Sequence, residues 1–285
     1  MIPANSDPIG VTVPVIPDDE EPLDQATLQR FLSLMGTDMV LIGGQALGYW
    51  MDRFGISPTG MVISNDGDAL RSIVGGVDRA KQIATALHAA VVVPDRRALT
   101  SLIAQIRIRT PSGKAKNIDI LHLLFTVNGL KSSGQFTRQV LRRSINVELM
   151  PGVEIRVMHP LDLLESRMHN AAGLVSDKGP HVITQARWAI QVAREAVLRS
   201  LASKQGGKDR VGAMVQFIYK LAHSQAGRRV LKDHGLEVLH SIPTDEIRNA
   251  EPVFDLQLAK IVAALEKRSI VITPEQVIPV DRPRG

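Results

Sequence analysis

Hydrophobic residues in the first part of the chain alternate between helical and strand spacing. From Asp24 they recur at helical spacing and stop at Gly36, which predicts a capped amphipathic helix. A continuous apolar run then predicts a buried strand, and the alternation continues beyond it. The expected elements are helix 24–35, strand 39–42, helix 46–54, a strand from residue 61 leading into Asp66 and Asp68, helix 77–89 and strand 91–93.

The strand pattern ends after two further pairs of strands. Period-two alternation and turn residues predict a hairpin over 102–124, with Asp119 in its second arm. A Pro-Gly turn joins a second pair, over 145–149 and 153–158. Only helical faces recur beyond this point, over 160–175, 182–201, 211–221 and 258–265.

These patterns predict an α/β (α+β) protein with two domains. The first, over residues 24–155, is a mixed β-sheet flanked by helices, and the second, over 156–273, is all-helical. An acidic, proline-rich and flexible arm is expected over residues 1–23, and a proline-containing tail over 274–285.

Composition narrows the chemistry that these domains can support. The 285 residues are 44% hydrophobic and include no cysteine, which excludes disulfides, thiolate zinc sites and cysteine nucleophiles. Residues 1–23 hold five acids and no Lys or Arg, so the rest of a chain of net charge +5 carries +10. That excess suits a nucleotide or nucleic acid, or else a solvated basic surface. Without an apolar run of membrane-spanning length or a signal peptide, we expect a cytoplasmic protein with no membrane partner.

Glycines and carboxylates supply the candidate site. Gly43 and Gly44 follow a predicted buried strand and open a helix, so their backbone N–H groups could approach a phosphate closely. Asp66 and Asp68, spaced i and i+2 on a strand, share a face and could bind Mg²⁺ or Mn²⁺. Asp119, on another strand, would complete the metal site. Three such acids suit metal-dependent phosphoryl or nucleotidyl transfer.

Several nearby residues also have ordinary structural interpretations. Ser64 could contact a phosphate, or form a local backbone hydrogen bond. Trp50 and Phe54 lie at helical spacing and are expected in the core, and His122 is expected to be structural. Lys178 is expected on the solvated surface.

These motifs resemble the nucleotidyltransferase superfamily that includes DNA polymerase β, aminoglycoside nucleotidyltransferases and toxin–antitoxin transferases. Gly43-Gly44, then Asp66-Gly67-Asp68, then Asp119 match its order of a glycine pair, an Asp-x-Asp pair and a third acid, over about residues 25–175. The long spacing and the helical C-terminal half look most like AbiEii-type toxins and related bacterial proteins. The resemblance implies a cation facing the triphosphate, and Arg167 is the candidate by position.

The function that this resemblance implies is Mg²⁺-dependent transfer of an NMP from an NTP such as ATP to a hydroxyl group. The acceptor would be an RNA such as tRNA, a protein or a small molecule, and a toxin-type enzyme would have an antitoxin partner. Gly67 departs from the apolar or β-branched residue usual between the paired acids. It motivates an alternative, a catalytically silent nucleotide- or partner-binding module on the same fold. A nucleic-acid-binding structural protein is a third interpretation, which leaves the aligned acids unexplained.

Overall fold

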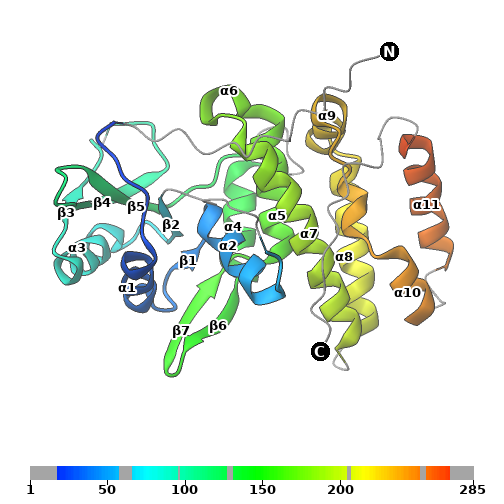
Figure 1. The fold of residues 1–285 in the computed structure, drawn as a ribbon, viewed down its shortest axis with the longest axis horizontal. Helices are drawn as coiled ribbons and strands as arrows, with labels where there is room; N and C mark the ends of the chain where they lie inside the picture. The colour runs from blue at the N-terminus through cyan, green and yellow to red at the C-terminus, as the bar shows by residue number, and fades with distance from the viewer. Residues whose placement is uncertain are drawn as a thin grey trace, which may run out of the picture.

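The computed structural model describes residues 18–57, 66–95, 97–126, 131–203, 207–250 and 255–269. These residues form a mixed α/β fold around one seven-stranded mixed sheet (Figure 1). The strands are β1 (Val40–Leu41), β2 (Gly67–Leu70), β3 (Ala90–Val92), β4 (Leu102–Arg109), β5 (Ala115–Leu121), β6 (Ile145–Met150) and β7 (Val153–Val157).

Helices precede, interrupt and follow the strands. They are α1 (Gln25–Met35), α2 (Gly43–Phe54), α3 (Gly76–Leu87), α4 (Ser133–Arg143), α5 (Pro160–Gly173), α6 (Val175–Lys178), α7 (His181–Ala202), α8 (Gly207–Ala222), α9 (Gln225–His234), the 3₁₀ helix η1 (Val238–Ser241), α10 (Thr244–Ala250) and α11 (Asp255–Ser269).

The sheet order is β3-β4-β5-β2-β1-β7-β6, which brings strands from distant parts of the chain together. At its centre β2 is parallel to β5 and antiparallel to β1, and β1 is parallel to β7. The β4–β5 and β6–β7 hairpins form the two sides, and β6–β7 projects from the body of the molecule (Figure 1). The central position of β2 therefore places its residues between β1 and the second arm of the first hairpin.

Most of the predicted elements are confirmed. Asp24 caps α1 by accepting a hydrogen bond from the Thr27 backbone N–H at 3.0 Å, and the helix ends before Gly36. The helix predicted over 46–54 begins earlier, at Gly43, because the glycine pair itself forms its first turn. The first part of the strand predicted from residue 61 lies outside the described residues, and β2 starts at Gly67, just after Asp66.

Helix α4 was not among the elements predicted from the sequence. Ser132 and Gln135 form a reciprocal capping box at its amino end, which stabilises the first turn. Its inward face holds only Phe136, Thr137 and Val140, so the apolar periodicity is too sparse to stand out among its glutamines and arginines. The capping residues Ser132 and Gln135, rather than hydrophobic spacing, could have predicted where this helix begins.

Beyond β7 the regular structure of the described residues is helical. Helix α7 packs on α5 and on α2, so these helices share one buried core with the sheet, extending from Leu23 to Ile261. The sheet lies at one end of the molecule and α8, α9 and α11 at the other (Figure 1). The division at residue 155 stays a prediction. None of the helices in the described part of the chain combines the length and apolarity needed to span a bilayer.

The described end of the predicted arm is bound to β5. The Ala115 backbone N–H donates to the Asp19 carbonyl at 2.9 Å, and the Glu21 N–H donates to the Ala115 carbonyl at 2.8 Å. Lys116 Nζ lies 2.6 Å from the Asp24 carboxylate, and this bond lowers the pKa of Asp24. The segment thus continues the sheet alongside the first residues of β5.

This attachment explains Gly67. A Cβ atom at that position would lie 3.3 Å from Cγ1 of Ile118 and 3.3 Å from Cδ2 of the buried Leu23. Gly67 therefore lies on the face of β2 that the segment covers, opposite to the face of its neighbour Asp68.

We predict that Gly67→Val lowers the free energy of unfolding by about 1–3 kcal/mol, because the added methyl groups overpack this contact. Urea denaturation of Gly67→Val, Leu23→Ala and the double variant measures the effect. If Leu23 is the obstacle, the double variant is less destabilised than the sum of the single changes. Additive losses would contradict this explanation of Gly67.

Candidate functional site

The junction of β1 and α2 approaches the Asp68 side chain very closely. The Ile42 backbone N–H donates to the Asp68 carbonyl at 3.1 Å, which ties the strand end to β2. Gly43 then has φ +68°, and a Cβ atom there would lie 2.1 Å from Oδ2 of Asp68. Only glycine permits both this backbone conformation and this contact. The N-cap residue of α2, Ile42, makes no side-chain capping hydrogen bond, and Gly43 and Gly44 are both buried.

Asp68 and Asp119 are neighbours across the sheet. They are register partners on the parallel strands β2 and β5, so their side chains leave the same face. Gln105 of β4 is the next partner in this row, and its Nε2 donates to Oδ1 of Asp119 at 3.0 Å. Asp66 lies directly before β2, where its carbonyl accepts a hydrogen bond from Nε2 of Gln45 at 3.3 Å. The prediction that Asp119 lies in the second arm of the hairpin is confirmed.

Two cationic side chains from the helical part act on these carboxylates. Arg167 of α5 is only 7% exposed, and its Nη1 donates to Oε1 of Gln185 on α7 at 2.6 Å. Its charge lowers the pKa of Asp68. Lys178, at the end of α6, is exposed, and its charge lowers the pKa of Asp66, Asp68 and Asp119.

The pKa of each carboxylate is nevertheless raised above its ordinary value. Burial, followed by the charge of Asp119, raises the pKa of Asp68 to about 7. Burial, Asp119 and Glu20 raise the pKa of Asp66 to about 6, and burial raises the pKa of Asp119. Burial and mutual repulsion thus outweigh the attraction of Arg167 and Lys178. Any added cation at this site would relieve that repulsion.

The structure brings most of the predicted site residues within electrostatic reach of one another. Asp66, Asp68, Asp119 and Arg167 are linked by charge, and Gly43 touches Asp68. Ser64 falls outside the described residues.

Two residues that act on the carboxylates were not among the predicted site residues: Gln105, and Lys178, which is exposed as expected but whose charge also lowers the pKa of the carboxylates. Gln105 could have been found from the register of the hairpin, which places it opposite Asp119. Lys178 carried no local signal, because only the packing of α5 and α6 brings it to the sheet.

The carboxylates of Asp66, Asp68 and Asp119 provide some, but not all, of the ligands that a divalent cation such as Mg²⁺ needs. Across the described residues, no group of three or more His, Asp and Glu side chains is placed to hold a metal ion. Mg²⁺, however, is usually bound by one or two carboxylates together with phosphate oxygens and water, rather than by an all-protein cage. Paired carboxylates with raised pKa values therefore suit a cation that arrives with a phosphate ligand.

Other residues near the motifs are structural. Trp50 Nε1 donates to the Met158 carbonyl at 2.8 Å, and its ring is buried, which confirms its predicted core position. Phe54 packs against the same core, and Arg199 lies 4.6 Å from its ring centroid. His122 is bonded through Nε2 to the Thr100 carbonyl at 3.2 Å, as expected for a structural histidine.

No protein-family model matches the chain, and no curated protein is significantly similar to it. The resemblance to nucleotidyltransferases therefore depends on the motifs alone.

We predict that Gly43→Ala disturbs the site far more than Gly55→Ala does. Both glycines have φ +68°, so both substitutions carry the left-handed backbone strain of about 1–2 kcal/mol. Nothing lies within 4 Å of a Cβ atom at Gly55, whereas one at Gly43 collides with Asp68. Chemical denaturation should show a larger loss for Gly43→Ala, by at least about 1 kcal/mol. Equal losses would mean that the approach of α2 to Asp68 is not tight.

We also predict that Asp68→Asn stabilises the metal-free protein at high pH. The pKa of Asp68 is higher in the folded protein than in the unfolded chain. Protonated Asp68 therefore contributes its full stability below pH 3.8, and this contribution is lost as the pH rises through about 7. The variant should therefore exceed the native protein in unfolding free energy by about 1–3 kcal/mol at pH 8, and by much less at pH 4. Denaturation at both pH values tests this, with the exposed Asp52→Asn as control. A gap independent of pH would refute it.

Proposed function

We propose that the protein is a Mg²⁺-dependent nucleotidyltransferase that moves an NMP from an NTP to a hydroxyl acceptor. The observation that carries the proposal is the pairing of Asp68 with Asp119 beside the glycine that begins α2. An uncapped helix N-terminus favours phosphate, and paired carboxylates favour the divalent cation that accompanies a triphosphate. The two features together suit a metal-bound NTP better than either alone.

Each residue of the site has a role in this proposal. The backbone N–H groups of Gly43 and Gly44 would bind phosphate oxygens, where a side chain would obstruct the approach. Lys178 and Arg167 carry positive charge towards the carboxylates and would neutralise the triphosphate. Asp119, oriented by its hydrogen bond from Gln105, would receive the proton of the acceptor hydroxyl.

Asp66, Asp68 and Asp119 are the residues that would hold Mg²⁺ or Mn²⁺. The ion, when bound, would neutralise phosphate charge and lower the pKa of the acceptor hydroxyl. In the transfer, the acceptor oxygen forms a bond to the α-phosphorus. The bond to the bridging oxygen breaks, and pyrophosphate leaves with its electron pair. Holding acceptor and α-phosphate in line supplies much of the acceleration in such reactions.

The finer features of the fold belong to the same proposal. We infer a nucleotidyltransferase-like sheet, in which β1, β2 and β5 carry the site, followed by a helical domain that chooses the acceptor. The acceptor would be an RNA such as tRNA, a protein or a small molecule. Use as a toxin, held inactive in the cytoplasm by an antitoxin, is a further proposal that rests on transferase activity.

A catalytically silent nucleotide- or partner-binding module is the alternative. Its motivation is Gly67, which stands between the paired acids where the family that the motifs resemble has an apolar or β-branched residue. Such a module would bind the nucleotide at Gly43 and the cations of the site without transferring it.

Incubation with each α-³²P-labelled NTP, Mg²⁺ or Mn²⁺ and a cell extract tests the proposal. We predict labelled product with at least one NTP, and a loss of about 100-fold or more in Asp68→Asn and Asp119→Asn, because each removes a carboxylate from the reacting centre. Asp52→Asn, on the exposed side of α2, is the matched control and should retain activity. Nucleotide binding without transfer would favour the silent nucleotide-binding module. If the protein neither binds nor transfers a nucleotide, both the transferase and the nucleotide-binding module are refuted.

A further inference from the structure

A basic groove follows the outer side of α4. Over Ser133–Arg143 this helix contains three arginines and no acidic residue, and Lys131 directly precedes it. The groove measures about 550 Å³ and is lined by Lys131, Gln135, Arg138, Gln139 and Arg142. The four helical residues of this set are spaced i, i+3, i+4 and i+7, so they form one face of α4. That face is turned away from the buried Phe136 and Val140.

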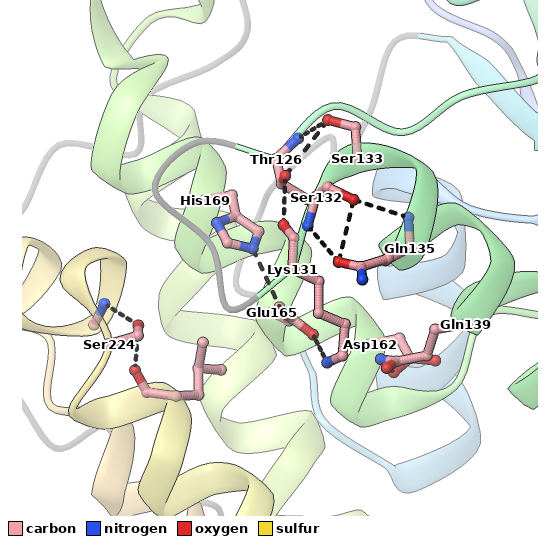
Figure 2. A network of polar contacts seen from close by, with 12 residues as sticks. Thr126, Lys131, Ser132, Ser133, Gln135, Gln139, Asp162, Glu165, His169 and Ser224 are labelled. Carbon is pink, nitrogen blue, oxygen red and sulfur yellow. Dashed lines mark hydrogen bonds and ion pairs between the residues drawn. The ribbon is translucent and has the colours of Figure 1, made fainter.

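Buried acids of α5 anchor this helix from beneath. Oδ1 of Asp162 accepts a hydrogen bond from Nε2 of Gln139 at 2.7 Å and lies 3.0 Å from Nη1 of Arg143. Lys131 Nζ reaches towards Glu165 and lies 3.7 Å from its Oε2 (Figure 2). Both acids are 0% exposed, whereas the side chains of Lys131 and Arg143 are each 30% exposed, so these pairs fix the floor and one end of the groove at the protein surface.

Phe217 of α8 supports the same two cations. Its ring centroid lies 5.6 Å from Lys131 Nζ and 5.7 Å from Arg143 Cζ. Two of the four basic side chains around α4 are therefore already paired within the protein.

Arg138 and Arg142 remain available. Both are exposed, and neither forms an ion pair with any residue that the structure describes. They stand four residues apart, about 6 Å along the helix axis, on a helix held by buried bonds. The result is a pair of guanidinium groups that faces solvent and has no ion-pair partner among the residues that the structure describes.

Such a pair favours the phosphates of a chain over a single small anion. Guanidinium groups bind phosphate oxygens in a fork geometry, and unpaired cations spaced along an open groove can each contact a different phosphate. Gln135, which is exposed beside the arginines, supplies a neutral donor suited to phosphate or sugar oxygens, whereas the Gln139 amide is already bonded to Asp162. The described side chains that line the groove are all polar or basic, as suits a phosphate chain.

We propose that the α4 groove binds the phosphate backbone of a nucleic acid, with Arg138 and Arg142 as its principal contacts. In this proposal the bound strand is the acceptor, and one of its hydroxyl groups enters the site. This role of the strand rests on the proposed function. Arg167 lies two residues after Glu165 on α5, and therefore on a different side of the same helix from the groove. The groove is thus separate from the carboxylates.

Fluorescence anisotropy with labelled oligouridylate, its oligodeoxythymidylate counterpart and an RNA hairpin tests the groove without NTP or metal. At about 0.1 M salt we expect Arg138→Glu/Arg142→Glu to weaken binding at least about tenfold. The slope of log K against log salt should fall by about 1.4 to 2, since two phosphate contacts are lost. Both side chains are exposed and unpaired, so the melting temperature should be unchanged.

Arg228→Glu/Lys232→Glu on α9 is the matched control. It reverses two exposed cations at the same i, i+4 spacing and changes the net charge equally, so it should bind as the native protein does. Equal losses in both double variants, or no binding by the native protein, would overturn the proposal. Asp68→Asn should retain binding. If binding depends on Arg138 and Arg142 but no nucleotide is ever transferred, the proposed function fails while the groove stands.

Discussion

Repulsion between carboxylates held side by side on neighbouring strands is the constraint on which the candidate site depends. The register of β2 on β5 fixes Asp68 next to Asp119, the glycine of α2 closes the space around Asp68, and a hydrogen bond from Gln105 holds Asp119. A pKa raised from 3.8 to about 7 corresponds to at most about 4 kcal/mol of unfavourable interaction in the ionised form. Arg167 and Lys178 reduce this cost but do not remove it. A fold maintained for stability alone would gain by replacing such a group, whereas a site for cations and phosphates requires it.

The N-terminal segment adds to this repulsion. Its backbone pairs with β5 at Ala115, which lies beyond the stretch of β5 that pairs with β2. This pairing brings Glu20 close enough to raise the pKa of Asp66. The same segment places Leu23 over Gly67, on the opposite face of the strand. The glycine between the paired acids departs from the pattern of the family that the motifs resemble, and it therefore has a packing explanation that leaves the orientation of Asp68 unaffected.

The order of elements was largely predictable because buried strands and amphipathic helices leave their periodicity in the sequence. Such periodicity singled out three residues of the site: Asp68 and Asp119, which lie within strands, and Gly43, which follows the end of one. Arg167 could be proposed only by position in the resemblance. Lys178 reaches the sheet only through the packing of helices far along the chain, for which no local pattern exists. Helix α4 was missed because polar capping, rather than an apolar face, defines its start.

Helix α5 joins the candidate site to the groove. Nearly all of its residues are buried, yet it carries Asp162, Glu165 and Arg167, and a buried helix can hold charges only where each meets an opposite charge. Residues two positions apart on a helix point about 200° apart, so Arg167 serves the carboxylates of the sheet while Glu165 serves Lys131 on the other side. Since both sets of charges are fixed by one rigid helix, the separation between groove and carboxylates is set by α5. A strand bound along α4 would therefore meet the site at a constant distance.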